Sequence, residues 1–161
     1  MHAAALKGSR RGFNRPRKYT DAVQKLQRHG ISVNGCFVLG MDHDTPRTLR
    51  LLPFWVDYLG LNLARFALLT PVPGSELYRD YERQGRILTR DWSQYTQSKV
   101  VFRPQHMSPE RLAYLYEQVW KRSYTWGAVL RRVKRVQVST PLEKAIVFFC
   151  NVGFKFLGKD M

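Results

Sequence analysis

The chain has 161 residues, of which 44% are hydrophobic and 24% charged, a composition that excludes a wholly disordered protein and fits one domain with a sizeable core. Lysine and arginine outnumber aspartate and glutamate by 27 to 12, which gives a net charge of +15. This excess predicts an anionic partner (nucleic acid, anionic lipid or a phosphorylated substrate), or a basic surface that is solvated or faces an acidic region elsewhere.

The N-terminal segment, Met1–Lys18, is basic and shows no periodicity, so it is predicted to be a loop or a segment that packs on something before it. No signal peptide is predicted, because the short apolar start is followed by basic residues. A short helix is predicted over Tyr19–His29, and Gly30 ends it.

Two apolar runs of strand length follow, Val33–Leu39 and Leu63–Leu69. They begin thirty residues apart, and their lack of polar alternation predicts parallel strands buried on both faces, joined in one βαβ unit. Between them a helix is predicted from Pro46, capped by Asp44 or Thr45 and ended by Gly60, with a bend or a late start at Pro53. Two strands make a poor domain, so the chain either pairs through its sheet edge or is the C-terminal part of a larger α/β protein.

The second half is predicted to be mainly helical. Ser75 caps a helix over Glu76–Gln84, and Ser108 begins the clearest amphipathic helix of the chain. A basic helix over Gly127–Val136 and another from Pro141 complete it. The chain is therefore divided into two parts. Residues 1–88 form the end of an α/β part, and residues 89–161 form a mainly helical extension.

The most apolar stretch is Ala145–Leu157, which is too short for the roughly 20 residues that span a bilayer. It is predicted to be a docking helix or an interfacial one. Cys36, expected in a buried strand, and Cys150 do not suggest a disulfide, so a reduced, cytoplasmic chain is predicted.

Parallel sheets bind ligands at the carboxyl ends of their strands, which makes 40–45 and 70–75 the candidate site loops. Gly40 allows close approach of a ligand, or serves only the turn. The run Asp42-His43-Asp44 suits a cation or acid–base chemistry, but with no third ligand in the sequence, helix capping and a solvated turn are favoured over metal binding. No catalytic residue and no metal ligand is predicted. Core packing is favoured over base stacking for the aromatic side chains, namely Trp92, Tyr95, Trp120, Tyr124 and Trp126.

Several motifs, in order, resemble the C-terminal half of radical S-adenosylmethionine enzymes. They read N-R-P-R-K-Y-T-D-A-V-Q-K-L-Q-R-H-G-I-S-V-N-G-C-F-V-L-G-M-D-H-D-T-P, then L-L-T-P-V-P-G-S-E-L-Y, G-R-I-L, D-W-S-Q-Y and M-S-P-E-R-L, within residues 14–124. The branch most similar carries a cobalamin-binding domain and includes enzymes acting on hopanoids and other lipid-like substrates.

The resemblance implies a partial (β/α)6 barrel in which 33–40 is the fifth strand and 63–69 the sixth. It implies S-adenosylmethionine, a 4Fe-4S cluster and, in the full-length relatives, cobalamin as cofactors. It also implies that seven residues contribute to the adenine side of the S-adenosylmethionine site: Phe37, Val38, Gly40, Asp44, Leu69, Thr70 and Pro71. Asp44 stands where the family more often has glutamate.

The cluster motif C-x-x-x-C-x-x-C is absent from the sequence, so the resemblance implies a piece that is inactive alone and requires a separate chain with the cluster-binding half. Two further readings involve no catalysis. One is a nucleic-acid-binding module that uses the Arg131–Arg135 cluster, and the other is a peripheral membrane module in which 145–157 meets an anionic lipid surface.

Overall fold

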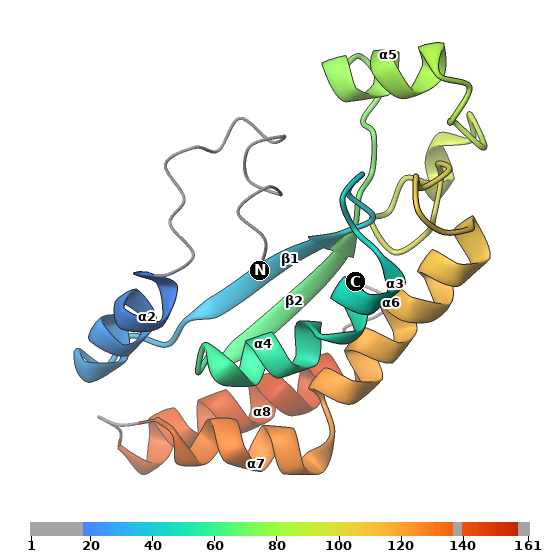
Figure 1. The fold of residues 1–161 in the computed structure, drawn as a ribbon. Helices are drawn as coiled ribbons and strands as arrows, with labels where there is room; N and C mark the ends of the chain where they lie inside the picture. Colours follow the sequence, from blue (N-terminus) through green and yellow to red (C-terminus); the bar gives the residue numbers. More distant parts are fainter. Residues whose placement is uncertain (1–17, 137–139, 158–161) are drawn as a thin grey trace.

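The computed structural model describes residues 18–136 and 140–157 (Figure 1). The basic segment expected over 1–18 lies, apart from Lys18, outside the described residues. In chain order the elements are α2 (Tyr19–Arg28), β1 (Asn34–Leu39), α3 (Pro46–Arg50), α4 (Leu52–Tyr58), β2 (Leu63–Leu68), α5 (Glu76–Arg83), the 3-10 turn η2 (Trp92–Gln94), α6 (Pro109–Ser123), α7 (Trp126–Lys134) and α8 (Pro141–Leu157).

The predicted βαβ unit is present. Strands β1 and β2 pair in parallel, in a register that runs from Asn34 opposite Leu63 to Leu39 opposite Leu68. The intervening helix is broken at Leu51 into α3 and α4, with Pro53 in the first turn of α4, where its missing N–H costs no hydrogen bond. The prediction of a bend at this proline is confirmed, and the fold class is α/β with a two-stranded parallel sheet in the described residues.

The helix ends follow the local signals. Thr45, rather than Asp44, caps α3, because its side chain accepts a hydrogen bond from the Thr48 amide at 3.2 Å. Ser75 and Ser108 cap α5 and α6 in the same way. These caps are decided by residues three positions apart, which is why the sequence alone predicts them.

One face of the sheet is covered by helices. The side chains of Leu39, Phe66 and Leu68 point into a core shared with α3, α4 and α6, and Figure 1 shows these helices, with α7 and α8, on the same side of the strand pair. The other face is largely exposed, since Cys36 and Val38 are both accessible on it. The expectation that both faces of β1 are buried, including Cys36, is therefore wrong for the described residues: burial in β1 alternates with the strand period of two.

The two edges of the sheet differ. At the outer edge of β2, the Tyr124 hydroxyl donates to the Ala64 carbonyl and accepts from the Ala64 amide at 3.1 Å, and the Leu68 amide donates to the Gln97 carbonyl at 2.7 Å. Among the described residues, no further strand pairs with the outer edge of β1. Side chains and loops thus close the β2 edge, while β1 keeps the edge at which a strand could be added.

A buried polar network joins the two predicted parts of the chain. The Asn62 side-chain oxygen accepts from Gln27 Nε2 at 2.8 Å and from the Val33 amide at 2.9 Å, and the Asn62 carbonyl accepts from Asn151 Nδ2 at 3.0 Å. Asn151 in turn accepts from the buried Arg132 guanidinium at 3.0 Å. The network therefore fixes α7 and α8 against the start of β2.

Helix α8 is 17 residues long, and within the described part of the chain no helix has the length and apolarity to cross a membrane. Val147 and Asn151 of α8 are buried. The opposite side of the helix exposes large apolar side chains, at Leu142, Ile146, Phe149 and Phe156.

Candidate functional site

The candidate site lies at the end of the sheet where the carboxyl ends of β1 and β2 meet. The Leu69 amide donates to the Leu39 carbonyl at 2.8 Å, so the loops that follow the two strands start side by side. The predicted site residues therefore lie at the same end of the sheet, because the two strands run in parallel.

Two of the predicted residues on β1 point in opposite directions. Phe37 packs in the core, where its ring stacks on Phe66 with centroids 5.6 Å apart. Val38 lies on the open face of the sheet and is 49% exposed. Of this pair, only Val38 presents its side chain to a ligand on the open face.

Gly40 is buried and has a backbone φ of +97°, a conformation that side chains disfavour. A Cβ built on it would lie 2.9 Å from both Leu112 Cδ2 and Phe102 Cζ. The close approach that this glycine permits is therefore to the protein's own core, in agreement with the turn alternative.

Asp44 holds the loop after β1 together. Its Oδ2 accepts from the Gly40 amide at 2.8 Å and from the Met41 amide at 3.0 Å. Burial raises the pKa of the Asp44 carboxyl, and these two hydrogen bonds offset only part of that effect. The carboxylate thus closes a turn, one of the two roles that the sequence left open.

The residues after β2 form the other half of the site. Leu69 is partly buried, Pro71 is buried, and the Thr70 hydroxyl donates to the Leu68 carbonyl at 3.2 Å. Leu69, like Phe37, is partly buried and packs against the core, so Val38 is the one exposed apolar side chain among the predicted site residues.

A polar cluster that the sequence analysis missed lies beside these loops. The Asp42 carboxylate accepts from Arg86 at 2.6 Å and from the Tyr81 hydroxyl at 3.1 Å, and the Arg86 guanidinium lies 4.0 Å from the centroid of the Tyr81 ring. Asp42 is 39 positions from Tyr81 and 44 from Arg86, and no local pattern links it to them. The cluster fastens the β1 loop to α5 and to the segment that follows α5.

The titration of these groups reflects their contacts. Partial burial would raise the pKa of Asp42, but the hydrogen bond and the positive charge of Arg86, helped by Tyr81, lower it below its usual range. Burial and the neighbouring Asp42 charge raise the pKa of Tyr81 to about 12. Asp42 is thus held as an anion by its partners, which suits an anchor better than a general base.

Metal binding has no support in this region. His43 Nε2 lies 3.8 Å from Asp44 Oδ1, and across residues 18–136 and 140–157 no three His, Cys, Asp or Glu side chains form a group that could hold a metal ion. The only two cysteines of the sequence, Cys36 and Cys150, are both free and lie on different elements, β1 and α8. These residues do not fit a 4Fe-4S cluster, which is held by four cysteine thiolates.

The basic cluster on α7 is largely used inside the molecule. Arg131 pairs with the Asp57 carboxylate at 2.6 Å, and Arg135 donates to the Asp57 carbonyl at 2.6 Å. Arg132 is 1% exposed and bonds to Asn151 and to the Ser123 carbonyl. The row of arginines therefore presents fewer free guanidinium groups than its sequence suggests.

No family model matches the chain. Among curated proteins, it is 26% identical over 129 residues to the bacteriochlorophyllide d C-12(1)-methyltransferase of Chlorobaculum tepidum. The aligned residues cover 80% of this chain and 28% of that enzyme. It is 25% identical over 119 residues to the C-8(2)-methyltransferase of the same organism (74% and 26% covered) and 27% identical over 128 residues to the hopanoid C-2 methylase of Rhodopseudomonas palustris (80% and 23% covered). The chain spans about a quarter of the length of these relatives, and over most of its own length it is similar to methyltransferases.

Proposed function

We propose that this chain forms the adenine-side part of the S-adenosylmethionine site in a methyltransferase of the radical type. The observation that carries the proposal is the similarity to methyltransferases over 74–80% of the chain, in three enzymes with two kinds of named substrate. When bound, S-adenosylmethionine would supply the methyl group or the adenosyl radical. Val38 is the exposed apolar side chain that suits contact with an adenine ring, and Leu69 lies beside the end of its strand.

The unequal edges of the sheet support a place at the end of a partial barrel. The last strand of a partial barrel has no neighbour on its outer side, so its outer backbone groups need other hydrogen-bond partners. Tyr124 and the Gln97 carbonyl are such partners for β2. A fifth strand needs a free edge for the fourth, as β1 has within the described residues. In this proposal residues 1–88 end the barrel and 89–161 form its helical extension, although the two parts share one core.

The cluster must come from elsewhere in this proposal, because the residues of this chain do not fit it. A separate region or chain would supply the cluster-binding half and, as in the resembled branch, a cobalamin domain. No step of the reaction is assigned to a residue of this chain. Its part is to position the cofactor.

We expect S-adenosylmethionine to shift the amide NMR signals of Val38, Gly40 and Thr70, and Val38→Asn to weaken its binding about fivefold, since lost apolar contact of this size costs about 1 kcal/mol. The measurement is a titration of the 15N-labelled chain. S-adenosylhomocysteine, which lacks the sulfonium charge, should move the same signals.

Ile31→Asn is the matched control for this titration, because Ile31 is also half exposed (51%) but precedes β1, at the opposite end of the strand from the site. Equal weakening by both substitutions would contradict the proposal. So would the absence of shifts at the strand ends when S-adenosylmethionine is present at millimolar concentration.

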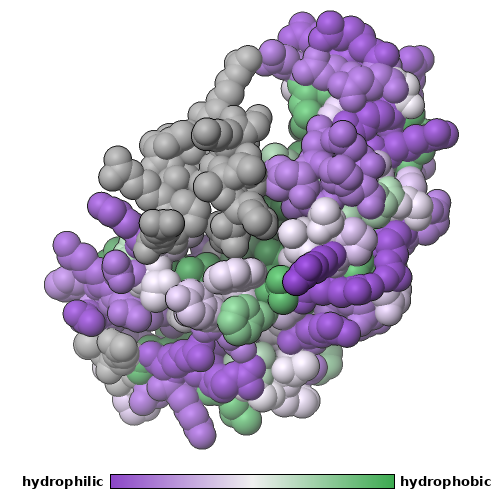
Figure 2. All heavy atoms as spheres, in the orientation of Figure 1, coloured by the Kyte–Doolittle hydropathy of each residue, from purple (hydrophilic) through white to green (hydrophobic). Residues whose placement is uncertain are grey.

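Peripheral membrane binding is a second candidate, favoured by one observation. On α8 the side chains of Leu142, Ile146, Phe149 and Phe156 are 53–69% exposed, at a spacing that places them along one side of the helix. Apolar residues interrupt the hydrophilic surface toward the end of the molecule where α4, α7 and α8 lie (Figure 2). With a net charge of +15, this apolar stripe suits an anionic bilayer surface.

We expect Phe149→Asp to lower partitioning onto phosphatidylserine-containing vesicles about tenfold, because the bilayer no longer buries the phenyl ring. Co-sedimentation measures it, and pure phosphatidylcholine vesicles should bind less of the unaltered chain. Val72→Asp is the control, since Val72 is 61% exposed but precedes α5, away from the stripe. Partitioning that is unchanged by Phe149→Asp would exclude α8 as the membrane contact.

A further inference from the structure

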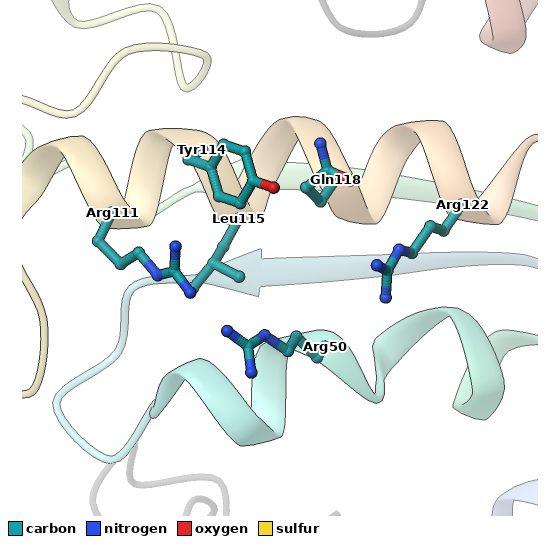
Figure 3. Close-up of a pocket in the computed structure, with 6 residues that line it drawn as sticks. All are labelled: Arg50, Arg111, Tyr114, Leu115, Gln118 and Arg122. Carbon is teal, nitrogen blue, oxygen red and sulfur yellow. The ribbon is translucent and has the colours of Figure 1, made fainter.

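A groove runs between α3 and α6 on the outer side of the helical layer (Figure 3). Its volume is about 290 Å³, and its lining residues are Arg50, Arg111, Tyr114, Leu115, Gln118 and Arg122. Arg50 comes from α3 and the others from α6. None of them belongs to the strand ends, so the groove is separate from the methyltransferase site proposed above.

The local geometry places three arginine side chains along the groove. Arg111, Leu115, Gln118 and Arg122 recur at spacings of four, three and four residues, which puts them on one face of α6. Leu115 is 1% exposed and forms the floor. Figure 3 shows Arg50 and Arg111 pointing toward one another, while Arg122 lines the groove further along α6.

The arginines of the groove have no ion-pair partner among the described residues. Within the described part of the chain, the ion pairs use Arg83, Arg86, Arg90, Lys121 and Arg131 together with His43, and none involves an arginine of the groove. The neighbouring acid Glu117 of α6 pairs with Lys121, and Glu110 bonds to Ser108. No carboxylate lines the groove, so three positive charges share it without a counter-charge from the described residues.

We propose that this groove binds the phosphoryl group of a phosphate ester or a pyrophosphate. Guanidinium groups bind such oxyanions through paired, charge-assisted hydrogen bonds, and three of them supply enough donors to surround one. The Tyr114 hydroxyl and the Gln118 amide add neutral donors at the same place. Arg111 stacks over the Tyr114 ring, 5.2 Å from its centroid, which holds its guanidinium at the groove.

The test is calorimetric titration of the whole chain with pyrophosphate at constant ionic strength. We expect saturable binding, and a loss of affinity of about tenfold for Arg50→Gln and again for Arg122→Gln, as expected when a charged hydrogen-bond donor is removed. Arg47→Gln is the matched control: Arg47 is exposed on the same helix, α3, and its removal changes the net charge equally, but it does not line the groove.

Vesicle binding, compared with the pyrophosphate titration, distinguishes a phospholipid from a soluble ester as the source of the phosphoryl group. If a phospholipid is the ligand, Arg50→Gln weakens binding to vesicles that contain phosphatidic acid even in the Phe149→Asp background, where α8 no longer contributes. If a soluble ester is the ligand, Arg50→Gln affects only the pyrophosphate titration. Equal losses for Arg47→Gln and Arg50→Gln, or no binding beyond that of chloride, would overturn the inference.

Discussion

Substitution of Gly40 by alanine is expected to lower the free energy of unfolding by about 2–4 kcal/mol, the sum of a strained backbone and an overpacked core. The φ of +97° disfavours any side chain, and the added methyl group would lie 2.9 Å from Leu112 and from Phe102. Both neighbours are completely buried, so neither has free space to move into. Urea unfolding followed by circular dichroism measures the change.

Gly60→Ala separates the two causes. Gly60 also has a positive φ, +72°, but a Cβ placed on it meets nothing within 4 Å. Its substitution is expected to cost only about 1 kcal/mol, the conformational part of the effect. Equal losses for Gly40→Ala and Gly60→Ala would show that the contact with Phe102 and Leu112 is unimportant.

Substitution of Asn151 by alanine is expected to cost about 2–4 kcal/mol, because it leaves a buried charged donor and a buried carbonyl without their partner. The Asn151 side chain accepts from Arg132 and donates to the Asn62 carbonyl, and it is completely buried. We expect the unfolding midpoint in urea to fall, with α8 released before the remainder of the helical layer.

Cys150→Ala provides the comparison on the same helix. Cys150 is exposed, and its substitution is expected to change the stability by less than about 0.5 kcal/mol. An Asn151→Ala variant as stable as Cys150→Ala would mean that apolar packing alone, such as that of Phe154 on Trp120, holds α8 in place.

The sequence predicted the fold well where the signals are local. Thr45, Ser75 and Ser108 each bond to a backbone amide three residues ahead, so the start of each helix is encoded within one turn. Pro53 likewise broke the helix where expected. The parallel pairing followed from two apolar runs and a connection of suitable length.

The exposure of β1 could not be predicted in the same way. Its run from Val33 to Leu39 is nearly all apolar, a pattern that fits burial on both faces, yet the described helices cover only one. Cys36 and Val38 are exposed because no described element packs on their side. Whether one or both faces of a strand are covered depends on the rest of the fold, and the sequence of the strand alone does not determine it.

The candidate site shows the same division. The carboxyl ends of the strands were located from the topology, but the roles of single residues were settled by contacts across long separations. Gly40 meets Phe102 and Leu112, and Asp42 meets Tyr81 and Arg86.

By itself, the sequence determined the βαβ order, the helix boundaries and a strongly basic chain, because hydrophobic period, capping and charge are properties of neighbouring residues. Only the tertiary structure decided which arginines are free. It buried Arg132, paired Arg131 with Asp57, and left Arg50 and Arg122 facing a common groove. The physical reason is that burial and ion pairing depend on which surfaces meet. Helix α3 packs on α6 and α7 packs on α8, and Arg131 meets Asp57 across 74 residues and Arg132 meets Asn151 across 19, separations that no local pattern specifies.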